Sequence, residues 1–212
     1  MAKPIDGRSR NRLATRESIS DAATQLFMER GFDDVTVDEI AEAAKVGRMT
    51  VFNHFPRKED MFFDRDEEIR ETVRATLRQR DPGMPPIEAL RLLAHRLVEE
   101  ESPYVDFSSM SQRYIETIER SETLKARARA IRGEIAHFVA VEITHGAGRE
   151  VDDPTAQLAA NLLLATWMVA HIEGHRTFRV SGDREKANAA FLGVVDRGTI
   201  GLKAAMAGTP YA

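Results

Sequence analysis

The sequence of 212 residues contains no cysteine and only 7% aromatic residues, among them a single tryptophan. The absence of cysteine excludes disulfide scaffolds, thiolate metal sites and cysteine nucleophiles, and it fits a reducing compartment. No basic-then-apolar leader opens the chain, so we expect a cytoplasmic protein rather than a secreted one.

Long hydrophobic runs are also missing. The most apolar stretch, Leu158 to Ala170, is interrupted by Asn161 and Thr166. A membrane-spanning helix needs about 20 consecutive apolar residues. We therefore expect a buried helix here and no association with a membrane.

The formal net charge of −4 argues against a uniformly basic nucleic-acid binder. Basic side chains nevertheless gather at the start of the chain, where Asp6 is the one acidic residue among Lys3, Arg8, Arg10, Arg12 and Arg16. A local basic arm can supply phosphate contacts even in an acidic protein. A solvated tail explains the same pattern equally well.

Apolar residues recur at spacings of three and four, without strand-like alternation, which predicts an all-α fold of about nine helices. One stripe runs from Ile19 to Phe27 and ends at Gly31, a plausible C-cap. Thr36 precedes a second, short stripe and has Glu39 three residues later, the spacing of a capping box. A third short helix is expected from Arg48 to His54.

A charged helix is expected from Lys58 to near Arg80, before the proline-rich break at 81–86. Further helices are predicted over 87–98, around 114–118, from 124 to about 145, after the Asp153-Pro154 start signal, and over 187–206. This organisation predicts a basic arm and N-terminal module at 1–57, a connecting helix at 58–80, and a C-terminal domain at 81–212.

The segment from Thr36 to Met61 contains the spacing of a helix-turn-helix: a capped helix, a short turn and a second short helix. In such a motif the first helix braces the second, whose N-terminal residues enter the major groove of DNA. A helical hairpin with no role in DNA binding would show the same spacing, so the residue pattern has to decide.

That pattern resembles the tetracycline-repressor-like (TetR) family of regulators over roughly Arg16 to Phe63. The matching motifs are Gly31-Phe32, Thr36-Val37, Ile40-Ala41, Phe52-Asn53-His54-Phe55 and Lys58-Glu59-Asp60-Met61. The chain departs from the family at Lys45, where glycine is usual, at Gly47, where serine or threonine is usual, and at Phe52, where tyrosine is common. If Lys45 adopts a positive φ, it bears a steric cost that glycine avoids.

The resemblance implies a homodimer that binds a palindromic double-stranded DNA operator. Arg48, Met49 and Thr50 would contact base edges, and Lys58 would hold a phosphate. The full set of expected DNA-binding residues is Thr36, Arg48, Met49, Thr50, Phe52, Asn53, His54 and Lys58.

The resemblance also implies a C-terminal domain that binds a small apolar or amphipathic effector of unknown identity and thereby releases the operator. Apolar walls with a few polar groups suit such a site, and the expected lining residues are Tyr104, Phe107, Met110, Tyr114, Phe138, Trp167, Met168 and His171. Helices near the C-terminus would form the dimer interface, through Leu158, Leu162, Phe191, Val194 and Leu202. The subunit's own core explains each of these apolar residues as well.

An enzyme is the alternative raised by His171 and His175, which lie four apart on one expected helix and could share a metal. A third ligand would have to come from elsewhere, such as His137 or Glu142, and the spacing is not that of a zinc protease motif. No nucleophile elbow, phosphate loop or paired carboxylates stand out. We therefore expect no enzyme activity, no cofactor and no metal, with a helical interaction module as the remaining alternative.

Overall fold

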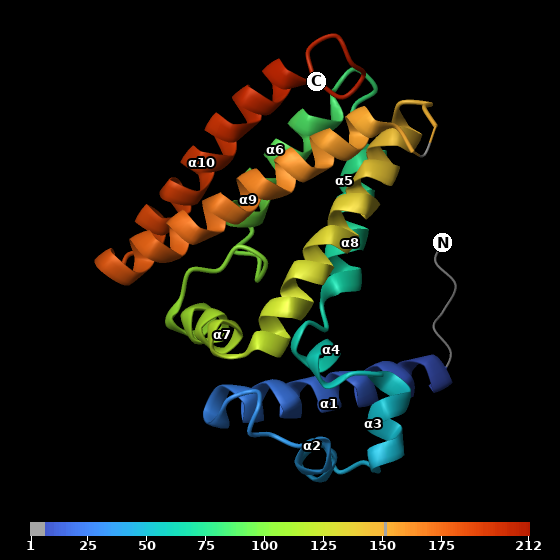
Figure 1. Cartoon of the computed structure of the whole chain (residues 1–212), viewed down its shortest axis with the longest axis vertical. Coiled ribbons are helices and arrows are strands. Elements are labelled where there is room, and N and C mark those ends of the chain that lie inside the picture. The colour runs from blue at the N-terminus through green and yellow to red at the C-terminus, as the bar shows by residue number, and fades with distance from the viewer. Residues whose placement is uncertain (1–6, 151) are drawn as a thin grey trace. The chain divides into compact units, whose positions relative to one another are not determined.

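The computed structural model describes residues 7–150 and 152–212, with side chains from residue 10 onwards, so Lys3, Asp6 and the Arg8 side chain of the expected basic arm lie outside the described part. The described residues form ten helices and no strand, which confirms the all-α fold (Figure 1). The helices are α1 Gly7–Arg30, α2 Val37–Ala43, α3 Arg48–His54, α4 Lys58–Phe62, α5 Asp66–Gln79, α6 Pro86–Glu99, α7 Ser109–Arg120, α8 Glu122–Gly146, α9 Pro154–Ser181 and α10 Arg184–Ala205.

Local signals in the sequence set the first three helices. Gly31 ends α1 with φ +93° and donates its N–H to the Phe27 carbonyl at 2.9 Å. Thr36 caps α2, and the reciprocal bonds with Glu39 complete the expected capping box. Helix α3 begins at Arg48 and ends at His54, as predicted.

The single helix expected over 58–80 is wrong, since the chain leaves the helical conformation between α4 and α5. Phe63, the C-cap of α4, has φ −109° and ψ 50°. The neighbouring Asp64 accepts a hydrogen bond from the Ser20 hydroxyl of α1 at 2.5 Å. Helix α4 is therefore fastened to α1 as a short separate element.

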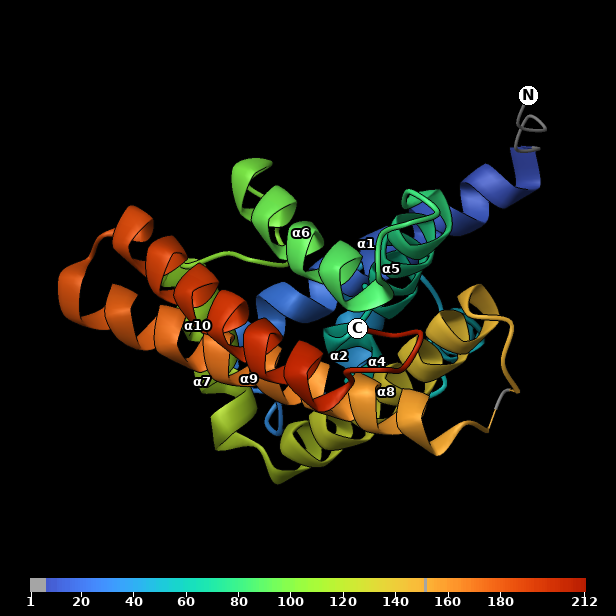
Figure 2. The ribbon, with the colours of Figure 1, turned by 90° about the horizontal axis from the view of Figure 1, so that it is seen from above.

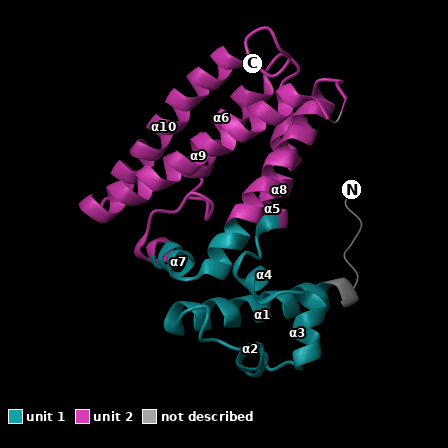
Figure 3. Ribbon diagram, viewed as in Figure 1, with its two compact units in different colours: residues 1–66, 113–128 teal, residues 67–112, 129–212 magenta. Residues whose placement is uncertain are grey.

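The chain divides into two compact units (Figure 3). Unit 1 comprises residues 1–66 and 113–128, and unit 2 comprises residues 67–112 and 129–212. Helices α7 and α8 each contribute residues to both units. The predicted functional ranges of 1–57, 58–80 and 81–212 concern roles rather than packing, and they stay a prediction.

The core of unit 1 is completed by residues far along the chain. Leu124 is fully buried among the apolar residues of α1 to α4, and Tyr114 stacks on Phe62 with ring centroids 4.3 Å apart. Ser121 also donates a hydrogen bond to Asp33 at 3.0 Å. The N-terminal module is therefore larger than the motif that marks it in the sequence.

In unit 2, α9 and α10 run side by side in both views (Figures 1 and 2). Their backbones approach closely at Gly198, where an added Cβ would lie 2.3 Å from the Thr166 side chain. This contact explains one glycine of the last helix. Gly193 and Gly201 face open space in the single chain.

The expectation that the apolar run forms a buried helix needs correction, because only one face of α9 is covered. Ala156, Ala159, Ala160, Leu163 and Ala170 are buried, whereas the other face exposes Leu158, Leu162, Met168, Val169 and Ile172. Among the described residues, α9 is the one helix long and apolar enough to cross a membrane by length and composition. A helix that packs in a protein core can pass the same test.

Candidate nucleic-acid interface and C-terminal sites

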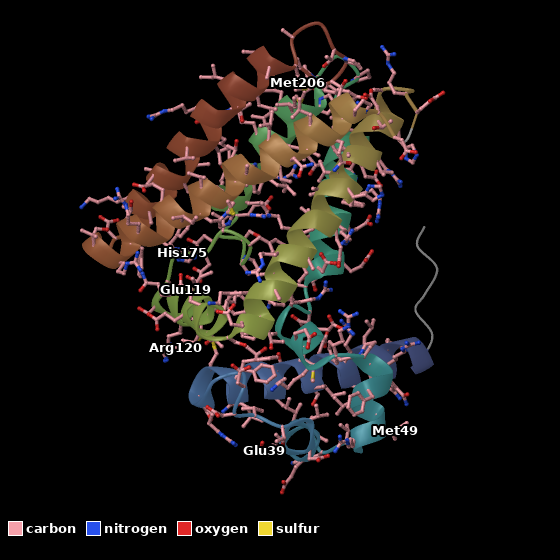
Figure 4. The ribbon with its side chains drawn as sticks, in the orientation of Figure 1. Glu39, Met49, Glu119, Arg120, His175 and Met206 are labelled. Atoms are coloured by element: carbon pink, nitrogen blue, oxygen red, sulfur yellow. The ribbon has the colours of Figure 1, made fainter. Side chains whose placement is uncertain are left out.

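The recognition helix α3 is anchored by one face and presents the other. Val51 and Phe55 are 0% and 1% exposed, so they fix the helix on the core of unit 1. Met49 is 71% exposed near the start of the helix (Figure 4), and Arg48 and Asn53 are exposed too. These side chains are accessible from the solvent, even to a ligand as large as DNA.

The turn between α2 and α3 is built without the usual glycine. Lys45 has φ +55°, the conformation that glycine would adopt without steric cost. Val46 donates its N–H to the Ala41 carbonyl at 2.9 Å and closes the turn. Gly47 is the N-cap of α3 and has no side chain to bond the free N–H groups.

Arg48 already has partners in unit 1. Its Nη1 lies 2.7 Å from Asp38 Oδ2, and both side chains are more than half exposed. The guanidinium also lies 5.6 Å from the ring centroid of Phe52, which is half-buried. Such an exposed ion pair contributes little to stability, so Arg48 can leave Asp38 for another partner at small cost.

Thr36 is committed to the capping box, because its backbone N–H donates to Glu39 Oε2 at 2.8 Å and its hydroxyl oxygen accepts the Glu39 N–H at 3.3 Å. The bonds that the Thr36 N–H and hydroxyl donate to the Glu39 carboxylate, and then the bond from Arg30, lower the pKa of Glu39 to about 2. Thr50 is half-buried, and its N–H donates to the Gly47 carbonyl at 2.8 Å.

Lys58, the expected phosphate contact, is bonded within unit 1 in the chain without DNA. Its ammonium donates to the carbonyl oxygens of Phe32 and Val35 at 2.7 and 2.9 Å, and it lies 4.1 Å from the centroid of the Phe32 ring. Burial lowers the pKa of Lys58. The side chain therefore ties the loop before α2 to the start of α4.

A basic hollow of about 310 Å³ lies between α1 and α3, lined by Arg12, Leu13, Arg16 and His54. Arg16 donates to the carbonyl oxygen of His54 at 2.7 Å and stacks over the Phe55 ring at 4.0 Å. Burial, and then the charges of Arg12 and Arg16, lower the pKa of His54. Part of the expected basic arm is thus fixed beside the recognition helix, where it suits an anion.

Three of the expected effector residues gather in unit 2. Phe107 is fully buried, with its ring centroid 6.3 Å from that of His171, which lies 6.5 Å from that of Trp167. Tyr104 joins them through its carbonyl oxygen, 3.1 Å from His171 Nε2.

The other expected effector residues lie elsewhere. Phe138 is covered by the guanidinium groups of Arg70 and Arg74. Met110 and Met168 are 55% and 40% exposed. The assignment of Tyr114 to the effector site is corrected, because Tyr114 packs against the core of unit 1 and its hydroxyl donates to the Phe62 carbonyl at 3.0 Å.

The residues expected at the dimer interface differ in how exposed they are in the single chain. Leu158 and Leu162 are 52% and 37% exposed on α9. Val194 is half-buried against the core, whereas Phe191 and Leu202 are 0% and 3% exposed inside it. The assignment of Phe191 and Leu202 to an interface is therefore corrected: both side chains hold α10 within its own subunit.

His171 and His175 do not form a metal site with a third ligand, since no cluster of three potential ligands occurs among the described residues. The two ring nitrogens of His171 face the carbonyl oxygens of Trp167 and Tyr104. The histidine pair is part of the packing of α9.

Comparisons with known proteins agree with this geometry. Residues 19–64 match the model of the bacterial regulatory proteins of the tetR family. The transcriptional regulator TcmR of Streptomyces glaucescens is 29% identical over 154 residues, which cover 69% of this chain and 66% of that protein. The putative mycofactocin biosynthesis regulator MftR of Mycobacterium tuberculosis is 47% identical over 49 residues, which cover 23% of this chain and 25% of that protein.

Among solved structures, the FadR repressor of Thermus thermophilus in complex with lauroyl-CoA is 26% identical and has a TM-score of 0.54, with 88% of this chain and 92% of that chain covered. The motif and the geometry of α2 and α3 thus define a helix-turn-helix domain of the kind found in bacterial regulatory proteins. Residues 19–64 thus carry the DNA-binding domain of the tetR family, and over the rest of the chain the likeness is one of fold. In each of the curated relatives named above, the matched stretch is less than two thirds of that protein's length.

Proposed function

We propose that this protein is a cytoplasmic, homodimeric transcriptional repressor that binds a palindromic DNA operator and leaves it when a small apolar or amphipathic molecule binds its C-terminal part. The observation that carries the DNA-binding role is the exposed face of α3. Arg48, Met49 and Asn53 project from a helix whose opposite face is locked by Val51 and Phe55.

Base recognition by this face follows from its chemistry. A guanidinium pairs with the two acceptors of guanine, an asparagine amide with adenine, and an apolar side chain such as Met49 contacts the thymine methyl group. The hollow of Arg12, Arg16 and His54 supplies positive charge beside the helix, where backbone phosphates lie on either side of a groove.

The dimer is supported by the uncovered face of α9 and the outer face of α10. One apolar stripe on α9 consists of Leu158, Leu162, Val169 and Ile172. On α10, Ile200 is 71% exposed, and Gly193 and Gly201 of the same helix face open space. A contiguous apolar surface of this kind marks an interface. A twofold dimer presents two recognition helices, hence the palindromic operator.

The effector role is supported by the aromatic and histidine residues inside unit 2 and by the relative that was solved with lauroyl-CoA. An effector that weakens operator binding with a coupling of about 1–3 kcal/mol lowers the affinity roughly 5- to 150-fold, and the operator must weaken effector binding by the same factor.

A footprint on the DNA flanking the gene tests the proposal. We expect protection of two symmetry-related half-sites about one helical turn apart, and release on addition of the effector. Protection of an asymmetric site by a single subunit would contradict the dimeric operator complex. Equal effector affinity of free and DNA-bound protein would contradict the release.

A further inference from the structure

Phe107 fills a slot against the backbone of α9. It lies in the segment between α6 and α7, and its side chain is fully buried. An added Cβ on Gly174 would come within 2.4 Å of the Phe107 ring, so the ring rests directly on the helix backbone at that glycine. The rings of His175 and Phe191 flank it at centroid distances of 5.0 and 5.8 Å.

Two polar atoms of this aromatic cluster have no hydrogen-bond partner among the described residues. They are Trp167 Nε1 and His175 Nδ1, and both are buried (His175 is labelled in Figure 4). A buried donor or acceptor without a partner costs about 1–3 kcal/mol. His171, between them on α9, has a carbonyl oxygen near each ring nitrogen, at 2.9 and 3.1 Å.

Hydrogen bonds and ion pairs hold the backbone and the polar side chains of the segment that carries Phe107, such as the bond from the Tyr104 hydroxyl to Glu68 at 2.7 Å. Glu101, near its start, has φ +50°, a conformation that is strained for a residue with a side chain. Asp106 pairs with Arg184 at 2.8 Å on the exposed surface, and the Tyr104 carbonyl meets His171. Val105 and Phe107 are the buried apolar side chains of this segment. None of these bonds involves the Phe107 side chain, so another ring could replace the Phe107 ring while the bonds remain.

We propose that Phe107 occupies the place of the effector's ring, and that the site takes a flat, neutral aromatic molecule with an acceptor oxygen conjugated to the ring, as in an aryl ketone. On binding, the aromatic ring of the ligand displaces Phe107 from Gly174, and its oxygen accepts the N–H of Trp167. This inference rests on the proposed function only in taking unit 2 as the effector-binding part.

The surroundings select for a neutral ligand. The walls are the rings of Trp167, Phe191 and the two histidines. The charges of Asp106 and Arg179 near His175 oppose each other, so an ionised ligand would lose its hydration without gaining a net counter-charge. Burial, together with the nearby His171, lowers the pKa of His175, which keeps that imidazole uncharged at neutral pH. An acceptor oxygen, by contrast, satisfies a donor that is otherwise unpaired.

The single tryptophan of the chain gives a direct test, because Trp167 contributes the one indole N–H signal in a ¹H–¹⁵N correlation spectrum of the full-length protein. The probes are acetophenone and ethylbenzene, which differ in the carbonyl oxygen. The variants are Phe107→Ala, which empties the slot, Phe107→Leu in case the first does not fold, and Leu90→Ala, which opens space at another buried position of unit 2.

We expect acetophenone to bind Phe107→Ala about tenfold more tightly than the wild type, as an aromatic ligand fills an engineered apolar cavity, and to move the indole signal downfield. Ethylbenzene should bind without that downfield shift. An indole signal that ignores acetophenone in both Phe107 variants would overturn the proposal, and so would an equal response in Leu90→Ala. Operator release is measured separately: an effector that releases the operator but leaves the indole signal unmoved overturns this inference and leaves the proposed function intact.

Discussion

Arg48 of the recognition helix is paired with Asp38 of the preceding helix, with Nη1 and Oδ2 2.7 Å apart. The side chain expected to recognise a base is therefore held in the free protein by a carboxylate of α2. Because both groups are more than half exposed, the ion pair is weak and does not prevent Arg48 from taking another partner.

Replacing Arg48 by alanine should weaken operator binding by about 1–3 kcal/mol and relax the preference at one base position. Asp38→Asn should instead strengthen binding to operator and random DNA alike, because it removes a negative charge and frees Arg48. Titrations by fluorescence anisotropy at fixed salt measure both effects. Arg30→Ala, which breaks the comparable surface pair with Glu39, is the matched control. Equal losses on operator and random DNA for Arg48→Ala would refute a role in base recognition.

Lys58→Met should destabilise the protein by about 1–3 kcal/mol, because two buried carbonyl groups lose their charged donor. The bonds to Phe32 and Val35 provide the reason. Chemical denaturation measures the change, and Lys186→Met, which removes a surface pair with Asp183, should leave stability nearly unaltered. An unchanged stability with a flatter salt dependence of DNA binding would restore the phosphate role.

Lys45→Gly should stabilise the protein by about 1 kcal/mol, because the positive φ of Lys45 costs a residue with a Cβ about that much. Lys45→Ala keeps the Cβ and should bring no such gain, which makes it the control. The measurement compares the urea midpoints of unfolding of the two variants. A glycine variant no more stable than the alanine variant would show that the turn is not strained.

Ile172→Glu and Ile200→Glu should each split the dimer, since a carboxylate would be buried in an apolar seam without a partner. Both residues are exposed in the single chain, at 59% and 71%. Light scattering after gel filtration gives the mass, and Met110→Glu, exposed at the start of α7, should remain dimeric. Single substitutions test the interface better than removal of the first 56 residues, because that deletion would expose the apolar side chains of Leu124 and Tyr114. A monomeric wild type would contradict the interface itself.

The sequence predicts well those features that depend on neighbours along the chain. Thr36 and Glu39 meet because a helix start brings positions three apart together, and Gly31 and Lys45 adopt positive φ where the motif requires it. Tyr114 and Leu124 could not be placed in this way, since their partners lie more than fifty residues earlier. The same limit applies to Phe191 and Leu202, whose apolar character fits a core and an interface equally well.

The role of Lys58 shows a further limit. The family pattern marks its position, but only the fold shows that two carbonyl groups lie within reach of its ammonium. In contrast, the hollow beside His54 could be anticipated in part, because Arg12 and Arg16 are four residues apart and share one face of α1.

His54 should make both stability and DNA binding depend on pH. Its pKa in the folded protein lies below the ordinary 6.5, first because of burial and then because of Arg12 and Arg16. As the pH falls below 6.5, the unfolded chain binds the proton more readily than the folded chain, so His54 lowers stability on acidification. A DNA phosphate in the hollow has the opposite effect on the pKa, because a negative charge favours the imidazolium.

Operator binding should therefore take up a proton, and affinity should rise as the pH is lowered from about 7 towards about 6. His54→Gln should flatten this rise while it leaves binding at pH 8 little changed, because the wild-type imidazole is neutral there. Arg16→Gln should weaken binding at every pH, since it removes a permanent charge and the bond to the His54 carbonyl. Anisotropy titrations across this pH range at constant ionic strength test the three proteins. If His54→Gln keeps the full pH dependence, the proton is taken up elsewhere and the hollow does not hold a phosphate.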